Sequence, residues 1–240
     1  MDPRYGERYR DLYQRHWWWR AREKAVLGVL AENLAPNGRQ RILDVGCGDG
    51  LLFDELLKFG DVEGLEPEAA LLDPTGPHRA RIHVGGLDSA FRPAQPYSAL
   101  LMLDVLEHLP EPAAALRHAA TLLAPGGVLL ITVPAFRLLW TQHDVLNHHV
   151  TRYRRSTLLP LVTDAGFDVK LARYYYHWMF PAKLVTRAVE AITRAGPAVP
   201  RVPPAPINQL LYAVSRMEQP LSRALPIPFG NSLLVLATKK

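Results

Sequence analysis

The sequence predicts an α/β fold with a parallel sheet covered by helices on both faces. Short apolar runs alternate along the chain with segments of helical periodicity, and most of the runs end at glycine or proline. Uninterrupted apolar runs are typical of strands that are buried on both faces. The 240 residues are 48% hydrophobic and include one cysteine, which suits a globular domain and excludes a disordered chain or a disulfide scaffold.

The predicted elements follow one another in a regular order. Residues 1–35 are predicted to be helical, and Asn37-Gly38 breaks the chain after them. The predicted strands are 41–46, 61–67, 81–86, the first part of 97–108, 128–134, 167–176 and 231–240. Helices are predicted after Gly50, over 110–127 with Gly126-Gly127 as the stop, and from Ser156 as N-cap to Gly166. Two further helices, about 181–195 and 207–224, flank a proline-rich linker, GPAVPRVPPAP.

Charge divides the chain into three parts. Residues 25–149 carry 8 Lys or Arg against 15 Asp or Glu, a net of −7, whereas 1–24 and 150–240 carry nets of +3 and +9. Basic flanks can face an anionic substrate, a membrane surface or nucleic acid, or they can be ordinary solvated arginines. The sequence has no apolar run of the ~18 residues that a spanning helix needs and no secretory signal, so we expect a cytoplasmic protein.

A glycine-rich loop, LDVGCGDG (43–50), follows the first predicted strand. Gly46 and Gly48 allow a tight turn and a close approach of a ligand to the backbone. A dinucleotide fingerprint would place its third glycine at position 51, which is Leu51 here, and acidic residues in and beside the loop disfavour a pyrophosphate. Glu66 ends the second strand, where a carboxylate can accept both hydroxyls of a ribose. We therefore expect a cationic ligand that contains a nucleoside and no phosphate.

At this point the sequence resembles the class I S-adenosylmethionine-dependent methyltransferases, over residues 41–135 and more loosely over 13–176. Four segments carry the resemblance in order: LDVGCGDG, LEP, LMLDVLEHLPEP and LLAPGGVLLITVP. The resemblance implies a doubly wound, mostly parallel, seven-stranded Rossmann-like sheet with an antiparallel last strand. It also implies S-adenosylmethionine as cofactor, with S-adenosylhomocysteine as product. The segment between the last two strands is longer than in the minimal pattern and is expected to be a helical insertion.

The resemblance also implies a set of cofactor contacts. Gly46 and Gly48 would line the methionine part, and Asp44 would act through water or hold the loop. Glu66, followed by Pro67, would bind the ribose, and Leu103 and Asp104 would face the methionine end. In a looser match, Leu87 and Asp88 would lie beside the adenine. From the N-terminal segment, Trp19 is expected at the rim of the cofactor pocket, and Arg22 is expected to pair with the cofactor carboxylate; core packing and a surface arginine are the alternatives.

The resemblance divides the chain into four parts. These are an N-terminal helical lid (1–35), a cofactor-binding core (36–176), a helical insertion or cap (177–230) and the last strand of the core sheet (231–240). The segments HWWWRAR (16–22) and HDVLNHHVTRY (143–153) resemble a narrower bacterial subgroup, which implies no substrate.

Candidate catalytic residues follow the fourth and fifth strands. His149 and Tyr153, with His108 after the fourth strand, are candidates to accept a proton, because ligands bind at this edge of a parallel sheet. His143, His149, Arg152 and Tyr153 are candidate substrate contacts, and a purely structural network around His149 is the alternative. Asp144, His148 and His149 also permit a metal interpretation, but no supporting ligand motif accompanies them and no metal is predicted.

The insertion is predicted to wall the acceptor pocket. Tyr176 and Trp178 open it as candidate substrate contacts, and an apolar helical face follows at Leu184, Val185, Ala188 and Ile192. We expect these helices to pack over the carboxyl edge of the sheet and to give an apolar cavity. A second subunit or a lipid surface could cover the same faces instead.

These observations predict methyl transfer to an O, N or C nucleophile of a small apolar or anionic acceptor. Two alternatives remain open at this stage. One is an enzyme that uses the same cofactor for other chemistry, and the other is a membrane-docked cofactor-binding module without turnover. Nucleic acid is not an expected partner, because aromatic residues do not interleave with a continuous basic stripe. Homodimer formation and peripheral membrane contact remain alternatives for the insertion.

Overall fold

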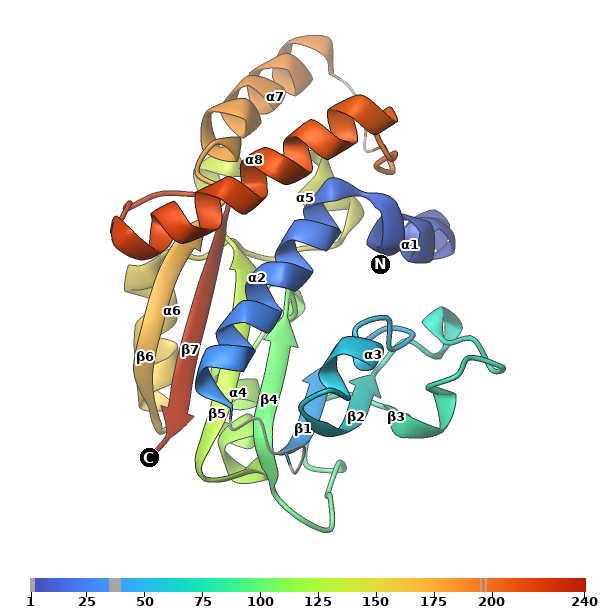
Figure 1. Cartoon of the computed structure of the whole chain (residues 1–240), viewed down its shortest axis with the longest axis vertical. Coiled ribbons are helices and arrows are strands. Elements are labelled where there is room, and N and C mark those ends of the chain that lie inside the picture. The colour runs from blue at the N-terminus through green and yellow to red at the C-terminus, as the bar shows by residue number, and fades with distance from the viewer. Residues whose placement is uncertain (1–2, 35–39, 195, 197) are drawn as a thin grey trace.

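A computed structural model describes residues 3–34, 40–194, 196 and 198–240 (Figure 1). Its centre is a seven-stranded sheet in the order β3-β2-β1-β4-β5-β7-β6. All neighbouring pairs are parallel except those that involve β7, which runs antiparallel to both β5 and β6. The predicted mostly parallel sheet with an antiparallel last strand is therefore confirmed. The predicted break at Asn37-Gly38 lies outside the described residues.

The strands lie close to the ranges that the sequence predicts. They are β1 (Gln40–Val45), β2 (Gly60–Glu66), β3 (Ile82–Val84), β4 (Tyr97–Leu103), β5 (Leu123–Pro134), β6 (Phe167–Tyr175) and β7 (Ser232–Lys239). In the middle of the sheet, Leu43 of β1 lies beside Leu100 of β4, which lies beside Leu129 of β5. All three side chains are fully buried. The apolar runs thus form the strands that are covered on both faces, as expected for a parallel sheet.

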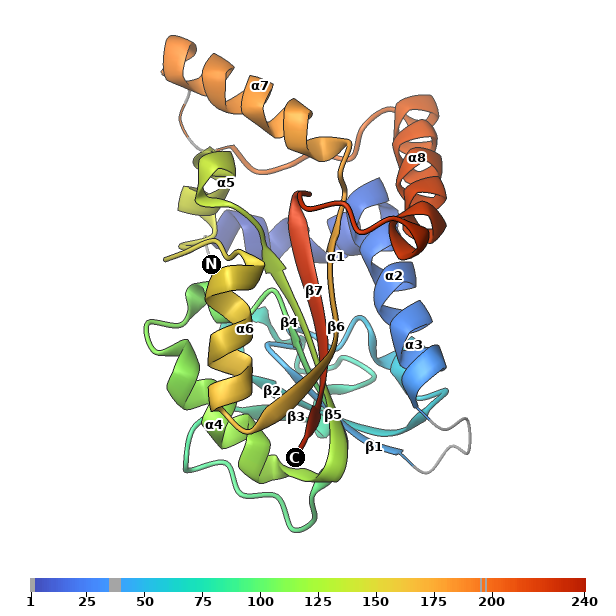
Figure 2. The same ribbon diagram turned by 90° about the vertical axis from the view of Figure 1, so that its left-hand side faces the viewer.

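Helices cover the two faces of the sheet (Figure 2). They are α1 (Pro3–Arg15), α2 (Trp17–Asn33), α3 (Phe53–Leu56), α4 (Pro112–Leu122), α5 (Gln142–Leu146), α6 (Arg155–Asp164), α7 (Met179–Thr193) and α8 (Ala205–Ala224). One apolar cluster lies between the sheet and α2, and a second lies between the sheet and the pair α4 and α6. The two clusters account for the doubly wound arrangement.

The predicted single N-terminal helix is wrong. His16 has extended backbone angles (φ −76°, ψ 134°) and separates α1 from α2. Its Nδ1 accepts a hydrogen bond of 3.2 Å from the backbone N–H of Trp18, so it satisfies one of the free donors at the start of α2. The break lets the two helices point in different directions, and α1 reaches over the carboxyl ends of β1 and β2 (Figure 1).

Three local boundaries also differ from the prediction. The helix predicted after Gly50 is only the four residues of α3. The fourth helix stops at Leu122, before Gly126-Gly127, because β5 begins at Leu123 and its pairing with β4 is interrupted by a register shift. Ser156 is not the N-cap of α6: the helix begins at Arg155, and Oγ1 of Thr157 accepts a 2.9 Å bond from the N–H of Arg154. Gly166, with φ +95°, follows the end of α6 as predicted.

The insertion between β6 and β7 forms α7 and α8, close to the predicted ranges. Both helices lie beyond the carboxyl ends of the parallel strands, and α8 runs along α2 (Figures 1 and 2). Oδ1 of Asn208 in α8 accepts a 2.9 Å bond from the N–H of Trp17, and its Nδ2 donates to the carbonyl of Arg15. The insertion is thus fixed to the junction of α1 and α2. None of the described helices is long and apolar enough to cross a bilayer.

Candidate active site

Two cavities meet at the carboxyl edge of the sheet. The first, called here the loop cavity, has a volume of about 350 Å³ and is lined by the glycine loop, Glu66, Tyr9, Arg10 and residues 70–73. The second, called the histidine cavity, measures about 500 Å³ and lies between α2, the ends of β4 and β5, α5 and α7. Tyr9 and Gly46 line both cavities, so a ligand in one adjoins a ligand in the other.

The glycine loop takes the backbone form that its composition predicts. Gly46, Gly48 and Gly50 have φ values of +68°, +53° and +69°, in the left-handed region that favours glycine. The N–H of Gly46 donates to the carbonyl of Leu65 at 2.7 Å, which ties the turn to the end of β2. A Cβ at Gly46 would approach Cγ2 of Val105 to 2.8 Å, so the turn also needs this glycine for packing.

Glu66 supports the loop from below. Its Oε2 accepts the N–H of Gly48 and its Oε1 accepts the N–H of Glu68, both at 2.9 Å. Burial raises the pKa of Glu66, and hydrogen bonds from these two N–H groups oppose that shift. Burial also raises the pKa of the neighbouring Asp44 to about 7. Two buried carboxyls beside the loop favour a cationic or hydroxyl-bearing ligand, as the sequence predicts.

The N-terminal helix α1 closes the loop cavity from above. The guanidinium of Arg10 forms an ion pair with Asp49 of the glycine loop and lies 3.5 Å from Asp73. Tyr9 stands beside it and packs edge-on against Trp19, with ring centroids 6.3 Å apart. Tyr9 and Arg10 thus bring α1 to the edge of the loop cavity.

Arg22 and Trp19 both lie at the histidine cavity. The side chain of Arg22 is buried, and its Nη2 lies 2.6 Å from Oδ2 of Asp104. Among the described residues, the buried Nε of Arg22 has no hydrogen-bond partner. Asp104 itself adopts φ +59°, a conformation uncommon for residues other than glycine, which turns the chain sharply at the end of β4. Leu103, just before it, also lines the cavity.

Asp144 is the centre of a group of hydrogen bonds that includes His149. Nδ1 of His149 lies 2.9 Å from Oδ1 of Asp144, which also accepts a 2.7 Å bond from Nε of Arg152. The N–H of Thr141 donates to the other oxygen of Asp144. Burial alone would raise the pKa of Asp144, but the bonds from His149 and Arg152 hold it well below its usual value. Asp144 is therefore ionised, and it orients the imidazole by accepting a hydrogen bond from Nδ1–H.

Two more histidines and a lysine face the same cavity. Burial lowers the pKa of His143 to about 3 and that of His108 to about 4, so both are neutral near pH 7. The rings of His108 and His149 stand nearly perpendicular, with centroids 4.8 Å apart. Nζ of Lys183 donates to Oγ1 of Thr141, and burial lowers the lysine pKa.

Several predicted contacts lie elsewhere. The buried hydroxyl of Tyr153 donates to the carbonyl of Leu106, and Tyr153 packs in the core between the sheet and α4. Tyr176 donates to the carbonyl of Trp18, and Nε1 of Trp178 donates to Oγ of Ser215 in α8. These three side chains attach the segments around the cavity to one another and are not among its lining residues. The prediction placed them at the cavity because they follow strands. Their side chains point instead toward the core or toward α8.

The residues that are predicted to lie beside the adenine are also found elsewhere. Asp88 lies in the exposed loop after β3, where its Oδ1 accepts the N–H of Ala90. Leu87 packs against the core on the α4 side, and Pro67 is exposed beside Glu66. None of the three lines either cavity, whereas residues 70–72, which were not singled out, line the loop cavity.

The insertion lines the histidine cavity with its polar face. Met179, Lys183, Thr186 and Glu190 recur at helical spacing along α7 and line the cavity. The predicted apolar face points outward instead, since Val185 is 63% and Ile192 is 82% exposed. The expectation of a cavity walled by apolar insertion residues therefore holds for Met179, Ala198 and Pro200, which line the cavity, and is wrong for the predicted apolar face of α7. The aromatic lining comes from α2, through Trp17, Trp18 and Trp19.

Sequence reasoning missed one buried acid. Glu107 lines the histidine cavity and is fully buried, and neither of its carboxylate oxygens bonds to another described residue. Its neighbour His108 was singled out, but an acid next to a histidine after a strand gives no sign of burial.

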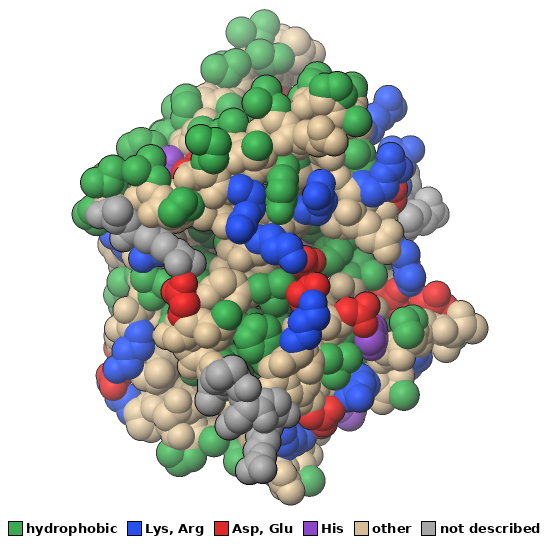
Figure 3. Space-filling model, viewed as in Figure 1, with side chains coloured by type: hydrophobic (Ala, Val, Ile, Leu, Met, Phe, Trp, Pro, Cys, Tyr) green, Lys and Arg blue, Asp and Glu red, His purple; other side chains and the backbone are tan. Residues whose placement is uncertain are grey.

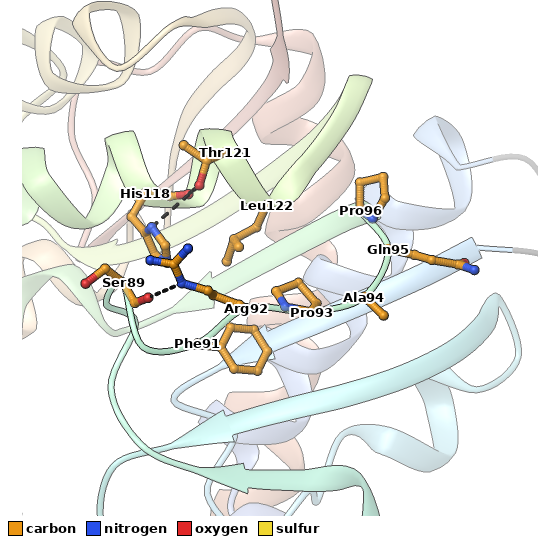
Figure 4. A pocket seen from close by; sticks show the side chains of 10 residues that line it. All are labelled: Ser89, Phe91, Arg92, Pro93, Ala94, Gln95, Pro96, His118, Thr121 and Leu122. Atoms are coloured by element: carbon orange, nitrogen blue, oxygen red, sulfur yellow. Dashed lines mark hydrogen bonds between the residues drawn. The ribbon is translucent and has the colours of Figure 1, made fainter.

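A separate hollow of about 520 Å³ lies far from these residues (Figure 4). It is formed by the loop 89–96 and the end of α4, at the edge where β4 and β5 begin. Its polar groups bond to nearby backbone: Nε of Arg92 donates to the carbonyl of Ser89, and Oγ1 of Thr121 donates to that of His118. Ligands of parallel α/β sheets bind at the opposite edge, where the loop and histidine cavities lie.

Comparison with known proteins shows which family the chain resembles. A methyltransferase domain family matches residues 18–171. The ubiquinone biosynthesis O-methyltransferase of Xanthomonas axonopodis pv. citri (strain 306) is 34% identical over 188 residues, which cover 67% of this chain and 77% of that protein. The chain spans about half the length, or less, of other curated relatives of the same name.

Two solved structures share the fold. A chain from a Haloferax volcanii complex of a methyltransferase activator with a methyltransferase has a TM-score of 0.60 at 16% identity, covering 98% of this chain and 93% of that one. The N-methyltransferase NodS from Bradyrhizobium japonicum WM9, in complex with S-adenosylhomocysteine, has a TM-score of 0.53 at 12% identity, covering 92% and 87%.

The residues present fit the predicted cofactor. The acidic loop suits an amine, Glu66 suits a ribose, and the free Nε of Arg22 suits a carboxylate. The predictions of the class I fold and of S-adenosylmethionine as cofactor are confirmed by these matches. The chain belongs to the methyltransferase domain family.

Proposed function

We propose that this protein transfers a methyl group to a hydroxyl oxygen of a small-molecule acceptor bound in the histidine cavity. The observation that carries the proposal is the His149–Asp144 pair, with an ionised carboxylate behind an imidazole, at a cavity that adjoins the glycine loop. The named activity of the 34% identical relative, an O-methyltransferase, supports oxygen as the acceptor atom.

The chain would hold the cofactor from both cavities. S-adenosylmethionine would supply a methyl group on a positively charged sulfur, which would keep the electron pair of the C–S bond when the acceptor oxygen takes the methyl group. Glu66 would accept ribose hydroxyls while it holds the loop, and Arg22 would pair with the amino-acid carboxylate. The polar cavity wall and the lid at Tyr9 and Arg10 would exclude water. Catalysis would rest mainly on alignment of the two reactants.

The acceptor would combine an apolar body with a hydroxyl group. Three tryptophans on α2 and Met179 offer apolar contact in the cavity. Lys183 and Arg152, which also line it, favour a partial or full negative charge. The hydroxyl proton would leave beside His149, and Nε2 would accept it because the carboxylate of Asp144 holds Nδ1 on the other side of the ring.

The test is methyl transfer itself. Purified protein is incubated with S-adenosylmethionine and a panel of phenols and catechols, and the masses of the products are measured by mass spectrometry. We expect S-adenosylhomocysteine and an acceptor that is heavier by one CH₂ group. His149→Ala should lower turnover by about 100-fold, the lower range for a proton-transfer residue, with little change in S-adenosylhomocysteine affinity. A product of unchanged mass would indicate non-methylating chemistry, and equal loss of turnover and affinity would indicate a folding role for His149.

We further propose that the outer faces of α7 and α8 contact an anionic lipid surface. The exposed apolar residues there include Val185, Val189 and Ile192 on α7 and Leu210, Met217 and Leu221 on α8. Figure 3 shows hydrophobic side chains over the part of the molecule where these helices lie, with Lys and Arg side chains beside them. Residues 177–230 carry six Lys or Arg against two Glu, which is the charge that an anionic bilayer attracts.

A further inference from the structure

Two of the described residues, Tyr9 and Gly46, line both the loop cavity and the histidine cavity. Gly46 contributes backbone alone, and a Cβ there would run into the side chain of Val105. Tyr9 is therefore the residue that brings a side chain to the place where the two cavities meet. Its ring also stands over the glycine loop, since a Cβ built on Gly48 would lie 3.8 Å from Cε1 of Tyr9.

The chemical formula of the cofactor places its sulfur at the same junction. Under the proposed function, on which this placement rests, Glu66 in the loop cavity holds the ribose and Arg22 in the histidine cavity holds the amino-acid carboxylate. The sulfur of S-adenosylmethionine joins these two parts of the molecule. A molecule that is held at both ends in this way passes between the cavities with its sulfur and its methyl group, beside Tyr9.

The sulfonium group needs a particular kind of partner. It carries a full positive charge but has no N–H or O–H, so it cannot be stabilised by donating hydrogen bonds. Three carboxylates that line the cavities are already engaged. Asp49 pairs with Arg10, and Asp104 pairs with Arg22. Glu66 accepts two backbone N–H groups. The electron-rich face of an aromatic ring attracts such a cation without requiring a free charge on the protein.

The ring of Tyr9 is held in place by other aromatic residues. Its centroid lies 6.2 Å from that of Tyr13 and 6.3 Å from that of Trp19, which it meets edge-on. The side chain of Trp19 also forms a hydrogen bond with the hydroxyl of Tyr9. Burial raises the pKa of Tyr9, so the phenol stays neutral at pH 7. The group at the junction is therefore a neutral ring in a fixed position, and little conformational freedom is lost when a ligand binds to it.

We propose that the aromatic ring of Tyr9 binds the positively charged sulfonium of S-adenosylmethionine at the junction of the two cavities. The neutral thioether of S-adenosylhomocysteine has no charge for the ring to attract. Tyr9 thus makes the chain favour the methylated cofactor over its demethylated product. Because the charge disappears when the methyl group leaves, the same contact weakens and the product is released more easily.

The ratio of two affinities tests the contact without acceptor or turnover. Calorimetry measures the binding of S-adenosylmethionine and of S-adenosylhomocysteine to the full chain. The two ligands differ in the methyl group and its charge, so dividing one affinity by the other isolates the sulfonium contact. Tyr9→Leu keeps apolar contact but has no aromatic face, and it should lower the ratio by about 5- to 30-fold, the range for a cation–π contact. Tyr9→Phe keeps the face and should change the ratio by less than about threefold.

Matched variants separate the contact from the packing of α1. Tyr13 lies one turn further along α1, packs against the ring of Tyr9 and lines neither cavity, so Tyr13→Leu should leave the ratio unchanged. Circular dichroism checks that each variant is folded, and Tyr9→Met is a second apolar replacement that should match Tyr9→Leu.

Three results would overturn the proposal. The first is an unchanged ratio in Tyr9→Leu and Tyr9→Met. The second is equal weakening of both ligands, which would leave Tyr9 only a covering role. The third is a loss in Tyr9→Phe as large as in Tyr9→Leu, which would assign the contact to the hydroxyl. If the ratio falls as expected and no acceptor is methylated, the proposed methyl transfer fails and the Tyr9 contact stands. If an acceptor is methylated and the ratio does not change, the Tyr9 contact alone fails.

Discussion

Nη2 of Arg22 lies 2.6 Å from Oδ2 of Asp104, which joins helix α2 to the end of the fourth strand at the histidine cavity. The pair connects a residue of the N-terminal segment with the segment that carries Glu107 and His108. Asp104 also bonds to Thr132 of β5, so three elements converge at one carboxylate. The N-terminal segment is therefore part of the candidate site and not only a cover for the core.

Replacing Arg22 should affect both stability and cofactor binding. Arg22→Met leaves the partly buried Asp104 without its ion-pair partner, so we expect a loss of about 1–3 kcal/mol in the free energy of unfolding. Binding of S-adenosylhomocysteine should weaken by about tenfold or more, since charge-assisted hydrogen bonds contribute about 1.5–3 kcal/mol. Chemical denaturation and calorimetry measure the two effects. Arg15→Met, at an exposed helical ion pair, serves as control; an unchanged affinity in Arg22→Met would contradict the carboxylate contact.

Glu66 is expected to determine the choice of cofactor. Glu66→Ala removes acceptors for the Gly48 N–H and for ribose hydroxyls, and should weaken S-adenosylhomocysteine binding by about 1–3 kcal/mol. Calorimetry of the parent protein should show no binding of NAD. Glu55→Ala on the surface of α3 should leave both results unchanged. Tight binding of NAD without a response to S-adenosylhomocysteine would reverse the interpretation of the glycine loop.

Two glycines allow backbone strain to be separated from ligand contact. Gly48 and Gly126 have φ values of +53° and +72°, and a Cβ would find open space at Gly126 and only ordinary contact at Gly48. Alanine at either position should therefore cost about 1–2 kcal/mol from the left-handed conformation. Only Gly48→Ala should also weaken S-adenosylhomocysteine binding, because only Gly48 lines the loop cavity, and Gly48→Val should abolish it. Equal binding by both alanine variants would exclude a close approach of the ligand to Gly48.

Acid should destabilise the protein through its buried histidines. Burial lowers the pKa of His143 from 6.5 to about 3, so between these values the unfolded chain binds a proton that the folded chain does not. The contribution of His143 to the free energy of unfolding is fully present above pH 6.5 and is lost as the pH falls toward 3. The pKa of Asp44 is raised to about 7, so this residue has the opposite effect: its contribution to stability is present at low pH and is lost as the pH rises toward 7.

A substitution isolates the histidine contribution from the total. We expect His143→Gln to be less stable than the parent protein at pH 7.5 and the difference in melting temperature to shrink toward pH 4.5. His83→Gln, at a half-exposed position on β3, should show no such convergence. A difference that stays constant with pH would mean that His143 is protonated equally in the folded and unfolded states.

The exposed face of α7 should determine binding to lipid. Val185→Ser with Ile192→Ser removes two exposed apolar side chains, each of which contributes about 1.5–3 kcal/mol when fully buried. We expect the parent protein to sediment with vesicles of equal phosphatidylglycerol and phosphatidylcholine at low salt, and the double variant to bind at least tenfold more weakly. Val84→Ser, at an equally apolar exposed site on β3, is the control. Absence of sedimentation would contradict lipid binding, and a dimer mass by light scattering that the double variant abolishes would assign this face to a second subunit.

Local sequence patterns determined the architecture of the sheet and the position of the glycine loop. Strands such as β4 and β5 carry continuous buried apolar runs, which are typical of strands covered on both faces, and the positive φ of Gly46 and Gly48 is a conformation that glycine adopts readily. The break at His16 and the start of α6 escaped prediction, because short side-chain hydrogen bonds decide such boundaries and periodicity does not record them.

Tertiary structure alone decided which polar side chains share the site. Tyr153, only four residues after His149, turns into the core and bonds to Leu106, whereas His149 faces the cavity and meets Glu107 from another strand. The direction of α7 was equally undetermined: its sequence shows an apolar and a polar face, and packing placed the polar one over the cavity. The physical reason is that the sequence pattern of a helix or strand determines which of its faces is apolar and which is polar. Only contacts between segments that are distant in the sequence determine what each face packs against.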